Sequence, residues 1–206
     1  MTIKKHNVEA LFAEPLFKAK IGHAISKEQI DYIQNTEMVP NKINQISKNL
    51  YLLEEPELKS IKDAAQEALD IYADEVMGIT QRLYITQSWS LISHPNIGMH
   101  GHSHSNSIVS GSIYYCDLPL PVAGMVFDRY TSYRQLELDP AVNKNNIYNT
   151  PMNVIDPKKD DLLLFSSRLQ HFVQINAGSK PRYSIAFNTF VKGELGSYKD
   201  VSQLNL

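Results

Sequence analysis

A change of pattern at residue 81 constrains the fold of this 206-residue chain more than any other feature. Before it, apolar side chains recur at helical spacing, which predicts an amphipathic helix over residues 57–76, with Leu58, Ile61, Ala65, Leu69 and Tyr72 on one face. From Gln81 onward this spacing disappears, and short β-rich runs alternate with Gly, Pro, Asn and Asp. The sequence therefore predicts N-terminal helices followed by a mainly β remainder.

The β-rich part is a series of short runs with no helical pattern between them. We expect strands near 82–93, 110–117, 123–128, 151–155, 161–166, 170–175 and 181–192. Many strands without intervening helices are typical of a sandwich, jelly roll or barrel. A further short strand at 15–21 and a helix capped by Ser26 belong to the N-terminal part. These N-terminal elements are expected to cover one face of a sheet.

The length of the sequence and its lack of a dividing linker predict one domain over residues 1–206. A typical domain has roughly 150 residues, and no linker or repeat divides this sequence. Residues 1–80 are predicted to form a helical support and residues 81–206 a jelly-roll core. Residues 129–150 have little periodicity and several Asn and Tyr, and loops of that length are usually functional or mobile. We interpret them as a lid over the mouth of the core.

Charge and composition exclude several classes of partner. Lys and Arg number 20 against 22 Asp and Glu, so the net charge of -2 offers no field that would attract nucleic acid or an anionic membrane. No apolar run approaches the roughly 18 residues of a membrane span. The single cysteine, Cys116, has no partner for an internal disulfide, and the polar opening lacks a secretion signal. We expect a cytoplasmic protein. The oligomeric state stays open, with a homodimer as one option.

Four of the seven histidines lie close together, at His94, His100, His102 and His104. Residues two apart on a strand point to the same side, so two imidazoles in an H-x-H unit can reach one metal ion. The alternative is a polar loop rich in His and Ser that binds no metal.

A second group of candidates lies near the end of the β-rich part. His171 follows an apolar run at 162–165, and Arg182 opens a run in which polar and apolar residues alternate. If the polar face of that run looks into the interior, the buried Arg182 needs an anion, and Ser184 can add a hydrogen bond to it. The alternatives are a surface ion pair for Arg182 and an ordinary core histidine for His171.

Taken together these motifs resemble a known family. The order H-x-H, SG-x-x-YY, a DLLLF strand, a distal His and R-x-S is similar to the iron(II)- and 2-oxoglutarate-dependent oxygenases. More narrowly it resembles a small bacterial and phage group of such oxygenases that carries an H-x-H signature. The resemblance implies a mainly β, double-stranded β-helix (cupin-like jelly roll) with the N-terminal helices packed on one sheet. It also implies Fe(II), 2-oxoglutarate and O2, and the hydroxylation of an unidentified small-molecule or peptide substrate with release of succinate and CO2.

The resemblance also implies roles for individual residues. It makes His102, His104 and His171 the catalytic metal ligands, and it makes Tyr115, Arg182 and Ser184 the residues that bind 2-oxoglutarate. His104 stands where the family usually has Asp or Glu. A register that pairs His100 with His102 stays open.

Two rival functions remain at this point. The first is a cupin-like dioxygenase with three histidine ligands that needs no 2-oxoglutarate, in which Arg182 has no role. The second is a metal-binding jelly-roll module without catalytic activity.

Overall fold

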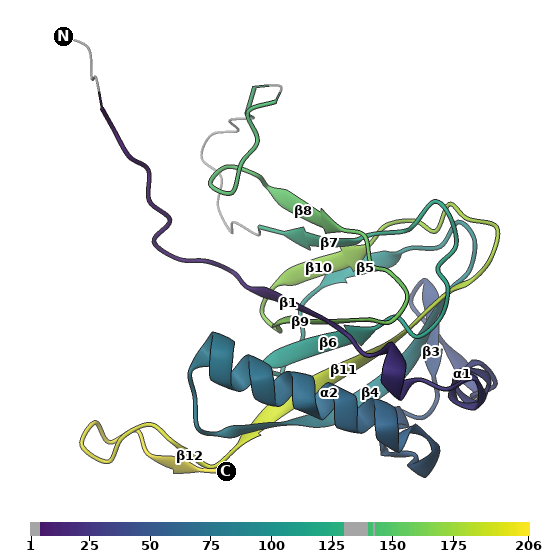
Figure 1. Ribbon diagram of the computed structural model, residues 1–206, viewed down its shortest axis with the longest axis horizontal. Helices are drawn as coiled ribbons and strands as arrows, with labels where there is room; N and C mark the ends of the chain where they lie inside the picture. Colours follow the sequence, from purple (N-terminus) through teal and green to yellow (C-terminus); the bar gives the residue numbers. More distant parts are fainter. Residues whose placement is uncertain (1–4, 130–139, 142) are drawn as a thin grey trace.

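Two antiparallel β-sheets face each other, and the main helices lie against the larger sheet (Figure 1). The computed structural model describes residues 5–129, 140, 141 and 143–206. The predicted jelly roll with N-terminal helices on one sheet is confirmed. Among the described residues, none of the helices has the length and hydropathy that a membrane crossing requires.

The larger sheet has seven strands and the smaller sheet has four. In spatial order the larger sheet contains β1 (Leu16–Lys20), β9 (Asp161–Ser166), β6 (Val109–Ile113), β11 (Arg182–Lys192), β4 (Arg82–Ser93), β3 (Asn44–Ser47) and β2 (Met38–Asn41). The smaller sheet contains β5 (Met99–His102), β10 (Gln170–Val173), β7 (Met125–Asp128) and β8 (Met152–Ile155). A short ladder near the C-terminus joins β12 (Glu194–Leu195) to β13 (Leu204–Asn205).

The helices follow the sequence pattern closely. α1 (Lys27–Gln34) begins with a capping box in which Ser26 and Gln29 satisfy each other's backbone N–H groups. α2 (Lys59–Ile71) continues into a π-helical turn, Tyr72–Met77, that ends at Gly78 in the left-handed region. Short 3-10 turns at Gly22–Ala24, Leu52–Glu54 and Pro56–Leu58 connect the remaining N-terminal segments.

The main core lies between α2 and the outer face of the larger sheet. Ile61, Ala65 and Leu69 of α2 are fully buried in the same cluster as Ile185 and Phe187 of β11. Burying one such aliphatic or aromatic side chain stabilises the fold by roughly 1.5–3 kcal/mol. The apolar face of α2 therefore packs on the outer face of the larger sheet. The inner face of that sheet stays available for the candidate site.

Strand β11 confirms the predicted alternation. Its apolar residues Ile185 and Phe187 pack toward α2, while Arg182, Ser184 and Ala186 line the space between the two sheets. Arg182 is charged and yet only 3% exposed. The alternation of β11 therefore separates the structural core from the candidate site.

The structure also contains strands that the sequence analysis missed. The hairpin of β2 and β3 extends the larger sheet, and β5 joins the smaller one. Their sequences, MVPN, NQIS and MHGH, contain Pro, Gly and polar residues that favour turns over strands. Half of the predicted lid at 129–150, namely residues 130–139 and 142, lies outside the described residues.

Candidate metal and anion site

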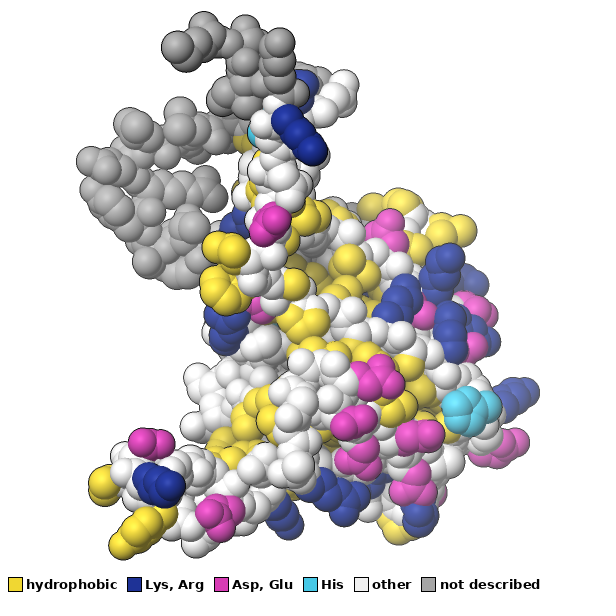
Figure 2. Space-filling view, turned by 60° about the vertical axis from the view of Figure 1, so that its left-hand side comes forward, with side chains coloured by type: hydrophobic (Ala, Val, Ile, Leu, Met, Phe, Trp, Pro, Cys, Tyr) yellow, Lys and Arg dark blue, Asp and Glu magenta, His cyan; other side chains and the backbone are white. Residues whose placement is uncertain are grey.

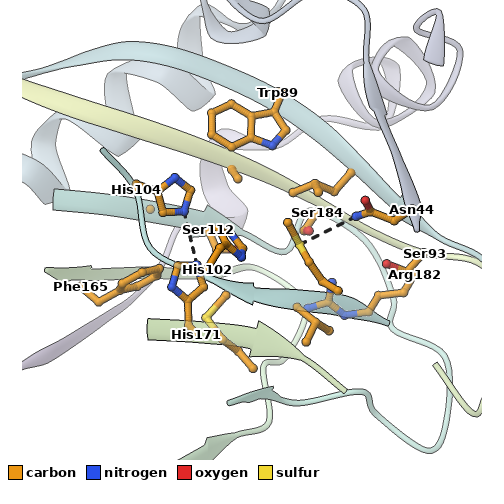
Figure 3. Close-up of a pocket in the computed structure, with 16 residues that line it drawn as sticks. Asn44, Trp89, Ser93, His102, His104, Ser112, Phe165, His171, Arg182 and Ser184 are labelled. Carbon is orange, nitrogen blue, oxygen red and sulfur yellow. Dashed lines mark hydrogen bonds between the residues drawn. The ribbon is translucent and has the colours of Figure 1, made fainter. Parts of the chain in front are cut away.

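A cavity between the two sheets collects most of the predicted site residues (Figure 3). The larger sheet contributes Trp89, Arg182 and Ser184, and the smaller sheet and the segment after β5 contribute the histidines. The metal candidates and the anion candidate therefore share one enclosed space.

Three histidines meet at one end of this cavity. His102 on β5 and His171 on β10 are direct cross-strand partners, and His104 follows two residues after His102. One ring nitrogen from each of the three lies within 4.8 Å of the others. The Nε2 atoms of His104 and His171 are 3.3 Å apart. Imidazoles at these separations can converge on a single metal ion.

Backbone carbonyl groups orient two of the rings. The Nδ1 atom of His102 lies 2.9 Å from the carbonyl oxygen of His100, and that of His171 lies 2.9 Å from the carbonyl oxygen of Leu169. A carbonyl oxygen only accepts, so each Nδ1 carries the hydrogen and each Nε2 presents a lone pair to the cavity. This is the arrangement that metal-binding histidines commonly use.

The rings of His104 and His171 are also held in the neutral form. Burial, and then the neighbouring rings of His171 and His102, lower the pKa of His104 to about 3. Burial lowers the pKa of His171 to about 4, although the hydrogen bond to Leu169 opposes the shift. Both groups are therefore unprotonated at neutral pH, as a metal ligand must be.

Arg182 lies at the other end of the cavity with unused hydrogen-bonding capacity. Its Nη2 donates to the Tyr114 hydroxyl at 3.3 Å, and its guanidinium carbon lies 5.2 Å from the centre of that ring. Its Nε is buried without a hydrogen-bond partner, and none of the ion pairs among the described residues includes Arg182. A buried cation without a counter-charge is costly, so this end of the cavity fits an anionic ligand.

The structure does not place the predicted tyrosine, Tyr115, beside Arg182. Tyr115 lies in the main core beside Ile113 and Tyr183, where burial raises the pKa of its hydroxyl. Tyr114, on the opposite face, is the tyrosine that contacts Arg182. Tyr115 and Ile113 share a face, and that face looks toward α2.

No carboxylate lines the described part of the cavity. Asp117 is 90% exposed and lies 3.7 Å from Lys159, and Asp128 lines a separate pocket. The alternative histidine, His100, has a buried Nδ1 with no hydrogen-bond partner, but it does not belong to the cluster of three.

The sequence analysis did not identify two polar residues of the cavity, Asn44 and Ser93. Asn44 lies on the missed strand β3, and Ser93 is the last residue of β4. Alternation along the predicted strand at 82–93 places Ser93 on the face of Trp89 and could have identified it. Trp89 is part of the cavity wall, and its ring centre is 6.1 Å from that of His104.

Solved structures share this fold at low sequence identity, which establishes the architecture alone. An oxidoreductase of the 2OG-Fe(II) oxygenase family from Burkholderia pseudomallei aligns with a TM-score of 0.59 at 13% identity, over 84% of this chain and 83% of that one. A Pseudomonas putida prolyl-4-hydroxylase aligns with a TM-score of 0.59 at 10% identity, over 87% and 94%. HygX from Streptomyces hygroscopicus, solved with nickel and 2-oxoglutarate bound, aligns with a TM-score of 0.60 at 11% identity, over 85% and 82%.

Sequence comparison gives the family. No curated protein matches the chain significantly. Residues 87–188, which run from β4 into β11 and include all three clustered histidines and Arg182, match the family described as "Putative 2OG-Fe(II) oxygenase". Through this region the chain belongs to the 2OG-Fe(II) oxygenase family, whose members are oxidoreductases that use Fe(II) and 2-oxoglutarate.

Proposed function

We propose that this protein is an Fe(II)- and 2-oxoglutarate-dependent dioxygenase that hydroxylates an unidentified substrate and releases succinate and CO2. The observation that carries the proposal is one cavity with three converging histidines at one end and, at the other, a buried arginine that forms no ion pair with any described residue. Residues 1–206 are taken to act as one oxygenase domain.

His102, His104 and His171 would hold the iron. Three protein ligands leave coordination positions for a co-substrate and O2. When bound, Fe(II) supplies the redox chemistry, in which O2 converts 2-oxoglutarate to succinate and CO2 and one oxygen atom enters a C–H bond of the substrate. The chain's own contribution is to keep the ring nitrogens unprotonated, to orient the co-substrate and to shield the centre with Trp89 and Phe165.

Arg182 and Ser184 would bind the far carboxylate of 2-oxoglutarate. The unpaired Nε and the remaining guanidinium N–H groups match a carboxylate, and Ser184 shares the cavity-facing side of β11. Tyr114 takes the position that was predicted for Tyr115, because its hydroxyl is already next to Arg182.

The charge of the site supports a dianionic co-substrate. Three neutral imidazoles leave the charge of Fe(II) at +2, which the dianion of 2-oxoglutarate would neutralise. With a carboxylate ligand in place of His104, the same complex would have a charge of -1. The histidine at 104 is therefore compatible with 2-oxoglutarate on charge balance.

A second hollow offers a path for the substrate. It lies between β1 and β8 and shares Phe165 with the metal cavity, and its floor includes Leu16, Phe127 and Ile155. Figure 2 shows hydrophobic side chains gathered below the projecting N-terminal segment. The rings of Phe127 and Phe165 both contact His171, with centre distances of 6.1 and 4.8 Å. These two aromatic rings would separate a substrate in this hollow from His171.

Calorimetric binding of 2-oxoglutarate separates this proposal from both rivals. Protein loaded with Ni(II), as a redox-inert substitute for Fe(II), is expected to bind one equivalent of 2-oxoglutarate, and metal-free protein is expected to bind it much more weakly. A dioxygenase that needs no co-substrate, or a binding module, would take up the metal without binding 2-oxoglutarate. That outcome would reject the proposal.

A further inference from the structure

Three polar residues form a row across the inner face of the larger sheet. Arg182 of β11 is the direct partner of Ser93 on β4. Gln45 pairs with Ile92 and Ile46 with Leu91, so the same register places Asn44 of β3 opposite Ser93. All three side chains line the same cavity and are at most 6% exposed. The row begins at Arg182 and ends at Asn44, two strands away.

The orientation of the Asn44 amide is fixed from outside the cavity. Asn41 Nδ2 donates to Asn44 Oδ1 at 3.1 Å across the end of the β2–β3 hairpin. With its oxygen so engaged, Asn44 directs its Nδ2 group toward the interior (Figure 3). The hairpin thus presents a hydrogen-bond donor to the cavity.

That donor has only a weak partner. Asn44 Nδ2 lies 3.8 Å from the sulfur of Met99, and a thioether is a poor acceptor. Burying an amide N–H against sulfur recovers little of its lost hydration, so a stronger acceptor is favoured there. A carboxylate oxygen is such an acceptor, and the same row already contains a cation that needs one.

We propose that Asn44 is a specificity-determining residue that donates through Nδ2 to the distal carboxylate of the bound 2-oxo dicarboxylate, in line with Ser93 and Arg182. This inference rests on the proposed function, because it takes 2-oxoglutarate as the occupant of the cavity. On binding, the carboxylate oxygen replaces the sulfur of Met99 as the acceptor. The residue thereby selects 2-oxo acids with a second carboxylate over those that end in a methyl group.

The test compares two ligands on Ni(II)-loaded protein by calorimetry. 2-Oxoglutarate carries the distal carboxylate, and 2-oxovalerate replaces it with a methyl group. Asn44→Ala is expected to weaken 2-oxoglutarate binding by about tenfold or more, the usual effect of one hydrogen bond to a charged group. Its affinity for 2-oxovalerate is expected to stay within about twofold of the wild type, because that ligand offers no distal acceptor.

A second variant distinguishes the loss of the hydrogen-bond donor from a purely structural effect of the substitution. Asn44→Asp has nearly the same shape and can still accept from Asn41, but it replaces the donor with a charged acceptor. We expect it to weaken 2-oxoglutarate binding more than Asn44→Ala does, through repulsion between carboxylates. Gln45→Ala is the matched control, since it truncates an amide on the same strand that contacts His94 and does not line the cavity.

The outcomes are distinct. Wild-type affinity for 2-oxoglutarate in Asn44→Asp would overturn the inference, and so would equal weakening of both ligands in Asn44→Ala. Failure of the wild-type protein to bind 2-oxoglutarate at all would reject the proposed function, and the inference with it. Selective loss of 2-oxoglutarate in both Asn44 variants, with Gln45→Ala unchanged, supports the inference.

Discussion

His102 and His171 face each other directly across strands β5 and β10, with their ring centres 4.5 Å apart. This pairing makes the smaller sheet the frame of the candidate metal centre, since one ladder sets the positions of two rings. His104 lies in the short segment after β5. Its backbone N–H donates to the carbonyl oxygen of Ser167, which holds this segment in place.

Replacing both paired histidines should abolish metal binding. The double variant His102→Ala, His171→Ala leaves His104 as the single member of the cluster, so stoichiometric uptake of Fe(II), Co(II) or Ni(II) is expected to disappear. Equilibrium dialysis with metal analysis measures it. His94→Ala is the matched control, because His94 contacts Gln45 and lies outside the cluster. Full uptake by the double variant would show that the metal binds elsewhere.

The third ligand is tested separately. His104→Ala should weaken Ni(II) binding by about 10-fold to 100-fold or more, whereas His100→Ala should leave it nearly unchanged. Competition with a chromophoric chelator gives both affinities. The reverse result would move the ligand pair to His100 and His102.

Metal-free protein should lose stability as the pH falls below about 6.5. The pKa values of His104 and His171 lie near 3 and 4 in the folded state, below the ordinary value of 6.5. Below pH 6.5 the unfolded chain binds protons at these positions while the folded protein does not, so acid favours unfolding. Each histidine contributes a slope of about 1.4 kcal/mol per pH unit until its folded pKa is reached.

Urea denaturation between pH 7 and 4 measures this slope. His104→Asn removes one of the two titrating groups and should reduce the dependence. An unchanged slope in that variant would mean that His104 titrates normally in the folded protein.

Asp161 should stabilise the junction of β1 and β9. Its carboxylate is fully buried, and the ammonium groups of Lys18 and Lys20 lie 2.7 and 2.9 Å from its oxygens. Burial raises the pKa of Asp161, but the two lysines and the Lys158 backbone N–H outweigh burial and lower it. Its contribution is therefore present above the ordinary pKa of 3.8 and is lost at lower pH.

Asp161→Asn removes this charge with little change of shape. We expect the free energy of unfolding at pH 7 to fall by about 1–3 kcal/mol, with the difference from the wild type shrinking toward pH 3. Chemical denaturation at both pH values measures it. A loss of equal size at pH 3 would contradict the charge argument.

Gly111 should tolerate no side chain while Phe187 is present. The two residues are cross-strand partners, and a Cβ at position 111 would lie 2.0 Å from Cζ of Phe187. Gly111→Ala is expected to cost about 1–3 kcal/mol of stability through overpacking. The double variant Gly111→Ala, Phe187→Leu should lose less stability than the sum of the losses in the two single variants, because the smaller side chain at position 187 makes room for the new Cβ. Strict additivity in thermal denaturation would contradict this close contact.

Alternation predicted the faces of β11 correctly, and it could also have placed the tyrosines. In β11 the buried charge of Arg182 identifies which face meets the cavity, because a guanidinium cannot lie in the apolar core under α2. In β6 the apolar residues Val109 and Ile113 share one face with Gly111, and Ser110 and Ser112 share the other. The same alternation puts Tyr115 on the apolar face under α2 and Tyr114 on the face of Arg182.

Asn44 could not have been found from the sequence. Its strand, NQIS, is polar and only four residues long, and its hairpin partner contains Pro40. Its place beside Ser93 depends on the long-range pairing of β3 with β4, and local patterns do not encode such a pairing. The histidines differ, because H-x-H spacing already directs His102 and His104 toward one point.

Turnover of 2-oxoglutarate tests the central claim most directly. Fe(II)-loaded protein under O2, with ascorbate supplying the two electrons that the unidentified substrate would give, is predicted to convert 2-oxoglutarate to succinate and CO2 in equal amounts, measured by NMR and by trapping labelled CO2. The His102→Ala, His171→Ala double variant and Arg182→Ala should form neither product above background. No succinate from wild-type protein that has bound both Fe(II) and 2-oxoglutarate would contradict the account.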